Sequence, residues 1–176
     1  DGRSLDQSGE NRTRQAAALG VRPVYQELSL VRDMSIAENM FLGAWPRKAG
    51  ILDHREMSRR AAEALANLGL HLDPTTKISS LSPAERQLVE IARAMMGEPK
   101  LVILDEPTSS LAAAEVDQVF AAVRRVREQG AALIYVSHRM KEIREIADTA
   151  TVMRDGRVVS TVDIGAADTR EIVRMM

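Results

Sequence analysis

The stretch LVILDEPTSSL at residues 101–111 restricts the fold of this chain more than any other part of the sequence. Its four leading apolar residues run directly into Asp105 and Glu106, and Pro107 cannot continue a central strand. A strand that is apolar on both faces is typical of a parallel sheet covered by helices on both sides. Ligands of such sheets bind beyond the carboxyl ends of the strands. The two acids therefore stand where a ligand is expected.

Strand and helix patterns alternate along the chain around this stretch, which favours the α/β class. Between about residue 33 and residue 97 the apolar spacing is helical throughout, and Gly69 and Gly97 are the expected helix ends. The other expected elements are a helix at 12–19, a short strand at 21–25 in which Pro23 favours an edge or a bend, strands at 100–104 and 131–136, a helix at 113–128, a helix that follows the strand at 131–136 and runs through about 147, and a hairpin around Asp155-Gly156.

The composition narrows the class of protein. The net charge of −1 gives no overall electrostatic attraction to nucleic acid or to an anionic membrane. The absence of cysteine excludes disulfides and thiolate metal sites. No apolar run approaches the roughly 18 residues that a membrane-spanning helix needs. The polar first residues, DGRSLDQSGENRTRQ, lack an initiator methionine, and we expect the chain to be cut from a longer one.

Asp105 and Glu106 suit two different tasks at one strand end. A single carboxylate can hold hydrated Mg²⁺ together with phosphate oxygens. The second can orient or deprotonate an attacking water. A buried strand with two solvated acids at its tip explains the same residues without any chemistry, and the pattern alone leaves both interpretations open.

Three further stretches bear on that choice. In LIYVSH, His138 follows the next strand after the acids, although a lone histidine is often a cap or a core residue. In LSPAERQ, Ser82 and Glu85 form a capping box with Pro83 at the first helical position. This is an ordinary helix start, and its free N–H groups also suit an anion. Gln26 follows the first strand and by itself carries little information.

In this order, the stretches resemble the ATP-binding cassette (ABC) ATPases over essentially the whole chain. VYQE is similar to the Q-loop, LSPAERQ to the signature motif, LVILDE to Walker B, PTSSL to the D-loop and VSH to the switch histidine. The longer stretches VYQELSLVRDMSIAENMFLG, LDEPTSSLAAAEV, YVSHRMKEI and TVMRDGRVV resemble the first cassette of tandem ATPase subunits in bacterial monosaccharide importers of the ribose, galactose and xylose type.

The resemblance implies ATP and Mg²⁺ as cofactors and a role for each strand-end residue. Asp105 is expected to hold Mg²⁺, and Glu106 to polarise the attacking water. His138 is expected to contact the γ-phosphate. Gln26 is expected to touch the metal or the water and to sense a permease. Because phosphoryl transfer depends on positioning and electrostatics, loss of one of these groups is costly.

The resemblance also implies partners. Ser82, Ala84 and Gln87 of the signature helix are expected to bind ATP held by a second cassette in a head-to-tail dimer. A membrane permease is expected to dock near residues 26–45, at the cytoplasmic face of the membrane, with a periplasmic sugar-binding protein acting indirectly. The implied function is ATP hydrolysis that energises sugar import, and nucleic acid is not an expected partner.

The implied architecture is a partial P-loop NTPase-like parallel sheet with an inserted helical subdomain. Residues 1–32 are expected to be the remnant of the core subdomain that carries the Q-loop. Residues 33–98 are expected to form the helical subdomain, which ends in the signature helix. Residues 99–176 are expected to complete the core subdomain with Walker B, the D-loop, the switch histidine and the terminal hairpin.

Three departures from the family pattern stand out. The 176 residues contain no G-x-x-x-x-G-K-[ST] motif, so we expect the chain alone to be inactive in hydrolysis. Pro83 and Glu85 replace residues of the glycine-rich signature, which removes an N–H donor and adds negative charge. Ala112 replaces a D-loop aspartate.

Two other classes of function stay open on the sequence. One is a cassette ATPase that acts without a permease, against which the near-neutral charge argues mildly. The other is a non-catalytic interaction module in which the two acids are only structural. The presence of both Glu106 and His138 favours catalysis over this second alternative.

Overall fold

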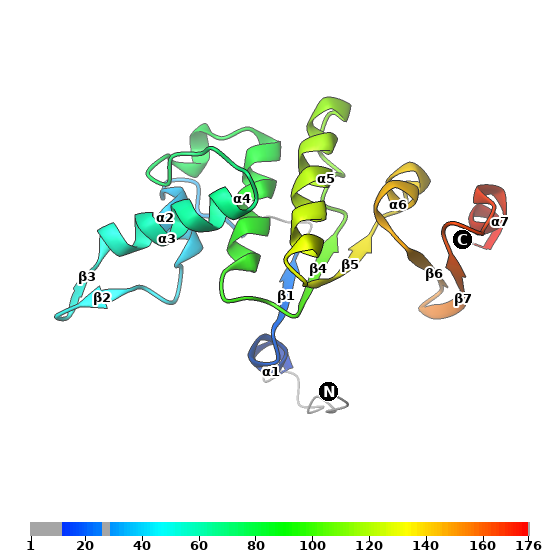
Figure 1. Cartoon of the computed structure of the whole chain (residues 1–176), viewed down its shortest axis with the longest axis horizontal. Coiled ribbons are helices and arrows are strands. Elements are labelled where there is room, and N and C mark those ends of the chain that lie inside the picture. The colour runs from blue at the N-terminus through cyan, green and yellow to red at the C-terminus, as the bar shows by residue number, and fades with distance from the viewer. Residues whose placement is uncertain (1–11, 26–28, 176) are drawn as a thin grey trace. The chain divides into compact units, whose positions relative to one another are not determined.

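A computed structural model describes residues 12–25 and 29–175 of the protein (Figure 1). The chain divides into two compact units, residues 1–134 and residues 135–176.

A parallel sheet forms the centre of the first unit. The strand order is β1 (Val21–Val24), β4 (Leu101–Asp105) and β5 (Ala132–Val136). β1 runs parallel to β4, with Val21 opposite Leu101 and Val24 opposite Leu104. Pro23 lies in β1, which stands at the end of this strand order among the described residues; of the predicted edge or bend, the structure shows the edge.

Helices pack on this sheet through the apolar faces that the sequence predicts. α4 (Pro83–Met95) contacts both β1 and α5 (Ala113–Glu128), and the two helices lie side by side in Figure 1. α1 (Arg12–Ala18) contacts β1. The fully buried side chains of this core include Val89, Ile91, Val102, Leu104, Val119, Val123 and Val126. The α/β class with a parallel sheet is therefore confirmed.

A helical region precedes α4 in the same unit. α2 (Ile36–Met40) packs on α3 (His54–Asn67) and α4, and a short 3-10 helix spans Ile78–Ser80. α3 ends near the predicted Gly69, whose φ is 68°. The left-handed backbone favours glycine at this position, and the Arg125 guanidinium, 1.4 Å from where a Cβ of residue 69 would be, would have to move to admit a side chain.

The expectation of purely helical structure between residues 33 and 97 is wrong at one place. β2 (Arg47–Lys48) and β3 (Ile51–Leu52) form an antiparallel hairpin. Ala49 and Gly50 between them have φ of 51° and 83°, the left-handed pair of a two-residue hairpin turn. Alanine is not a usual residue for such a turn, and two-residue strands are too short to show alternation. The sequence pattern therefore did not predict this hairpin.

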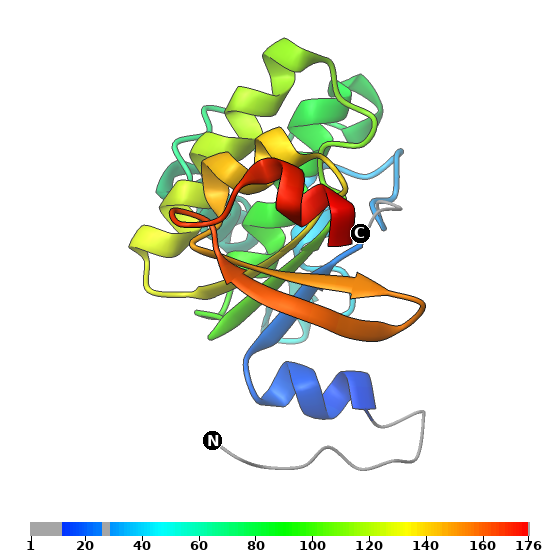
Figure 2. The ribbon, with the colours of Figure 1, turned by 90° about the vertical axis from the view of Figure 1, so that its right-hand side faces the viewer.

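The second unit is a hairpin covered by helices. β6 (Thr149–Arg154) and β7 (Arg157–Asp163) pair around Asp155-Gly156, as predicted (Figure 2). Val152, Ile164 and Ile172 form its core, against which Met140 and Ile143 of α6 (Met140–Ile146) pack. The residue Ile172 belongs to α7 (Thr169–Met175). In the described part of the chain, no helix is both long and apolar enough to cross a bilayer.

Glu38 closes a capping box at the start of α2, and this makes the stability of the chain depend on pH. Its carboxylate accepts the Ser35 backbone N–H at 2.7 Å and the Ser35 hydroxyl at 2.8 Å. These bonds hold the pKa of Glu38 below its ordinary value of 4.5. A lowered folded-state pKa contributes stability that is fully present above the ordinary value and is lost as the pH falls through the folded-state value.

Glutamine keeps a neutral acceptor but loses the charge, so we expect Glu38→Gln to lower the free energy of unfolding by roughly 0.5 kcal/mol at pH 7, the typical value of a carboxylate near a helix N-terminus. The difference between the two proteins is expected to shrink below pH 4.5, because the parent chain then loses the same ionised partner. Urea unfolding of both proteins between pH 7 and pH 3 measures this. A difference that stays constant with pH would contradict it.

Candidate functional site

The two acids of the Walker B stretch lie at the carboxyl end of β4. Asp105 is the last residue of the strand and is exposed, whereas Glu106 is half-buried. Glu106 has a φ of 46° and precedes proline, a combination that is unfavourable for a non-glycine residue. The Ser109 N–H donates to the Glu106 carbonyl at 3.1 Å and closes the following turn. Strained backbone of this kind concentrates at functional positions, which supports a role for this strand end.

The end of β1 reaches the same edge of the sheet. Because β1 is parallel to β4 and Val24 stands opposite Leu104, the carboxyl ends of the two strands lie side by side. Gln26, which was predicted to act here, lies outside the described residues. β1 defines this edge before Gln26, and Ser29 is the first described residue after it.

A buried carboxylate of α4 holds Ser29. Glu90 is 4% exposed, and its Oε1 accepts the Ser29 N–H at 2.9 Å and the Ser29 hydroxyl at 3.1 Å. Arg93 pairs with Glu90 Oε2 at 2.8 Å and also donates to the Ser29 hydroxyl. The signature helix is therefore bonded directly to the chain that follows the predicted Q-loop position. Sequence analysis missed Glu90, although an acid within the apolar run LVEIA was a usable signal.

Asn39 of α2 fixes the same connection a little further on. It is fully buried, accepts the Val31 N–H at 2.6 Å, and donates to the carbonyls of Val31 and Ser35 at 3.0 and 2.9 Å. Its carbonyl and amide groups are thus satisfied by the backbone of this connection. Together with Glu90, it ties the region after β1 to the helical region.

The predicted anion site at the start of α4 already contains a carboxylate. The Ser82 N–H donates to Glu85 Oε2 at 2.7 Å, and the Ser82 hydroxyl accepts the Glu85 N–H at 3.2 Å. Pro83 offers no N–H. An anion approaching this helix end therefore meets Glu85 in place of a glycine-rich loop, which agrees with the departure noted from the sequence.

Ala84 and Gln87 are inside the unit. They are 1% and 6% exposed, so a contact between the Gln87 side chain and a bound nucleotide requires a rearrangement of this helix. The Gln87 amide nitrogen is buried and has no hydrogen-bond partner among the residues that the structure describes. Such an atom is uncommon and costly in a folded protein.

A second buried glutamate organises the segment that carries His138. His138 itself is exposed and lies between β5 and α6. Glu142, 5% exposed, accepts the Tyr135 and Ser137 hydroxyls, both at 3.0 Å, and pairs with Arg139 at 3.3 Å. The residues on both sides of His138 are thus held by one carboxylate. Sequence analysis missed Glu142 as well.

The D-loop departure has a local consequence at α5. Ala112 occupies the N-cap position and offers no side-chain acceptor to the helix N–H groups. The Ala112 N–H donates to Glu115 Oε2 at 2.9 Å, so half of a capping box remains. The helix start is formed, but with a residue that is among the poorest N-caps.

The donor chemistry at the strand edge fits a magnesium ion that is shared with phosphate. Asp105 provides one exposed carboxylate, a hard oxygen donor of the kind that Mg²⁺ prefers. In the described ranges, no three residues of the types His, Asp or Glu gather as an all-protein metal cage. Mg²⁺ commonly needs only one or two carboxylates when phosphates and waters complete its coordination.

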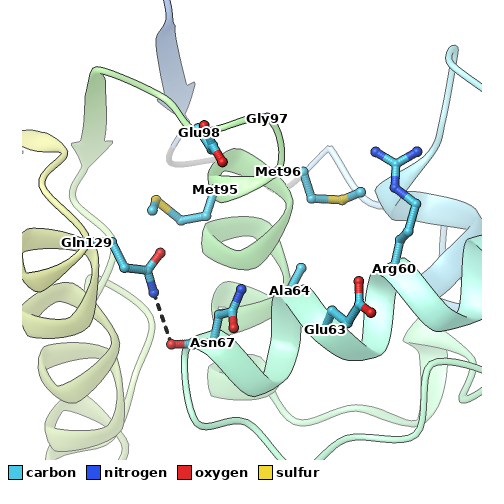
Figure 3. A pocket seen from close by; sticks show the side chains of 9 residues that line it. All are labelled: Arg60, Glu63, Ala64, Asn67, Met95, Met96, Gly97, Glu98 and Gln129. Atoms are coloured by element: carbon cyan, nitrogen blue, oxygen red, sulfur yellow. Dashed lines mark hydrogen bonds between the residues drawn. The ribbon is translucent and has the colours of Figure 1, made fainter.

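A hollow of about 190 Å³ lies elsewhere in the first unit (Figure 3). It is formed where α3, α4 and α5 end, and Met95, Met96 and Glu98 lie just before β4 begins. Gln129 at the end of α5 donates to the Asn67 carbonyl at 3.0 Å across one side of it. Because Asp105 stands at the opposite end of β4, this hollow is separate from the candidate site.

Solved structures define the class of this fold. The chain superposes on cbiO1 from Clostridium perfringens, part of the cbiONQ ABC transporter complex, with a TM-score of 0.77 and 25% identity over 99% of this chain and 68% of that one. The ADP conformation of an ATP-binding cassette of another ABC transporter gives a TM-score of 0.76 at 23% identity, over 92% of this chain and 69% of that one. The fold is that of an ATP-binding cassette.

Sequence comparison agrees with the fold. The ABC transporter family matches residues 1–109. An uncharacterized ABC transporter ATP-binding protein of Escherichia coli, YphE, is 56% identical over 93% of this chain and 33% of its own length. The arabinose import ATP-binding protein AraG of Azospirillum brasilense is 45% identical over 86% of this chain and 29% of its own length. The ribose import ATP-binding protein RbsA 1 of Rubrobacter xylanophilus is 43% identical over 92% and 32%.

The chain therefore belongs to the ABC transporter family, as the motifs predicted. It spans about a third of the length of the curated relatives that it matches.

We expect Glu90→Ala to lower the free energy of unfolding by on the order of 3 kcal/mol, because it leaves Ser29 and Arg93 without their buried acceptor. Glu63→Ala is the matched control: Glu63 is a helical, exposed partner of Arg59, and its loss is expected to cost less than about 1 kcal/mol. Urea denaturation measures both variants. Equal, small effects would contradict a structural role for Glu90.

Proposed function

We propose that this chain is part of an ATP-hydrolysing cassette that energises sugar import. Support comes from relatives that are named as arabinose and ribose import ATP-binding proteins and share 43–45% of the aligned residues. The observation that carries the proposal is the common carboxyl edge of β1 and β4. Val24 stands opposite Leu104, so Asp105 and the strained Glu106 lie at the edge where α/β sheets bind ligands.

In this proposal, each strand-end residue has a separate task. Asp105 holds Mg²⁺ and Glu106 orients the attacking water. His138 contacts the γ-phosphate, and Gln26 touches the metal or the water. Bound Mg-ATP supplies the phosphoryl group, and the residues of this chain provide positioning and charge complementarity. Glu90 and Glu142 act only through the segments that they hold.

The signature helix serves the nucleotide of a partner cassette in this proposal. Ser82 and the backbone at Ala84 lie at the start of α4, and Gln87 lies one turn further along. Glu85 already accepts the Ser82 N–H, so the partner's nucleotide can bind this N–H only if Glu85 releases or shares it.

The second cassette pairs head to tail with this one. Permease subunits dock on the helical region at residues 33–98, at the cytoplasmic face of the membrane. A periplasmic sugar-binding protein delivers the sugar.

We expect no saturable Mg-ATP binding and no turnover by the 176 residues alone, because they contain no phosphate-binding G-x-x-x-x-G-K-[ST] loop. The same chain extended upstream to include such a segment is expected to bind and hydrolyse ATP. Titration calorimetry and phosphate release measure the two activities. Tight binding by the short chain would contradict this prediction and would require another nucleotide site.

In the extended chain, Glu106→Gln is expected to lower turnover at least about a hundredfold while binding persists, because the variant keeps the shape of the side chain but not the base. Asp117→Asn provides the control, since Asp117 is an exposed acid on α5. Turnover that survives in Glu106→Gln, or that falls equally in Asp117→Asn, would remove the catalytic role of Glu106.

A further inference from the structure

The β2–β3 hairpin is an exposed structure that the proposed catalytic function does not use. All four of its strand residues, Arg47, Lys48, Ile51 and Leu52, are exposed, and Ile51 has 75% of its surface accessible. Figure 1 shows the hairpin projecting from the helical region into open space. Ile51 and Leu52, 75% and 40% exposed, contribute little to the core, and they stand beside two exposed cations on the same hairpin.

The pairing gives both faces of the hairpin the same chemistry. Arg47 stands opposite Leu52 and Lys48 opposite Ile51. Cross-strand partners share a face, and successive residues alternate between faces. Each face therefore carries one cation and one aliphatic side chain.

The two cations have not been neutralised by neighbouring acids. Within the described part of the chain, neither Arg47 nor Lys48 forms an ion pair. The acids that follow in sequence are engaged elsewhere: Asp53 caps α3 through the Glu56 N–H, and Glu56 pairs with Arg59. Although the whole chain has a net charge of −1, the segment RKAGIL at residues 47–52 has two positive charges and no negative one.

We infer that the β2–β3 hairpin docks on an anionic phospholipid surface. Aliphatic side chains that enter the headgroup region and cations that meet lipid phosphates are the combination that holds peripheral segments on membranes. A protein partner normally covers one face of a hairpin, whereas lipid headgroups surround both faces and give each the same environment. The equal composition of the two faces therefore favours lipid.

The turn holds the hairpin in a formed state before any contact with a membrane. Ala49 and Gly50 hold the strands together through a two-residue turn, and the Asp53 N–H donates to the Pro46 carbonyl at 2.9 Å at the base. Because the hairpin is already formed, docking does not need to order the backbone, which is a large part of the cost of binding.

The inference rests on the proposed function only in that a cassette docked on a permease lies beside the bilayer. The hairpin would add a lipid contact there to the contact with the permease, and the two together would bind more tightly than either alone. Lipid binding needs no nucleotide, so its test is independent of the ATP experiments above.

Trp45, the single tryptophan of the chain, provides the measurement. It is half-buried and lies two residues before Arg47. We would titrate the full 176-residue chain with vesicles of phosphatidylcholine containing about one-third phosphatidylglycerol, and with pure phosphatidylcholine. The expected result with the anionic vesicles is a blue shift of Trp45 emission and co-sedimentation, both of which decrease at high salt.

The variants identify the surface. Arg47→Gln with Lys48→Gln is expected to lower the partition coefficient about thirtyfold, which corresponds to about 1 kcal/mol for each cation. Ile51→Ser is expected to lower it severalfold. The β6–β7 hairpin supplies the matched control. Its Met153 and Val158 are 61% and 62% exposed, but Arg154 and Arg157 stand opposite each other on the other face and flank the acidic Asp155, so Arg154→Gln with Arg157→Gln is expected to leave binding unchanged.

Three results would overturn the inference. The first is equal binding to neutral and anionic vesicles. The second is binding that is lost in the β6–β7 variant and kept in the β2–β3 variant. The third is no binding to either vesicle by a chain whose circular dichroism shows that it is folded, which would assign the exposed hairpin to a protein partner. Failure here with successful ATP binding by the extended chain would leave the proposed function intact.

Discussion

Buried carboxylates that hold irregular segments are the interaction on which the arrangement of the candidate site depends. Glu90 fixes Ser29 in the first unit, and Glu142 fixes Tyr135 and Ser137 in the second. A buried charge is tolerated only when it is paired and hydrogen-bonded, and both glutamates meet that condition with hydroxyl donors and an arginine. Ser29 and Ser137, which lie outside the helices and strands, are thereby held in place.

The sheet supplies the other half of the constraint. A parallel pair brings two strand ends to one edge, and β4 is followed there by Glu106, whose backbone conformation is unfavourable. The cost of the Glu106 conformation is offset by the packed strand before it, in which Val102 and Leu104 are fully buried. Rigid strands and anchored loops together provide the preorganisation that phosphoryl transfer requires.

The elements that could be predicted differ from those that could not in the strength of their local sequence pattern. The strand at Leu101–Asp105 and the helices α4 and α5 were predicted because a long apolar period is a strong local signal. The β2–β3 hairpin was missed because its strands are two residues long and its turn begins with alanine. Glu90 and Glu142 were missed because their partners are 61 residues away in one case and hydroxyl groups in the other.

The sequence by itself determined the α/β class, the elements with strong periodicity, the capping box at Ser82 and the family, since each of these is written in local spacing or in contiguous motifs. Only the tertiary structure decided that Gln87 is buried, that Glu85 accepts the Ser82 N–H, that Glu90 holds Ser29, and that Ile51 is exposed opposite Lys48. Burial and long-range hydrogen bonds depend on which surfaces meet after folding. No local pattern of residue types specifies that meeting.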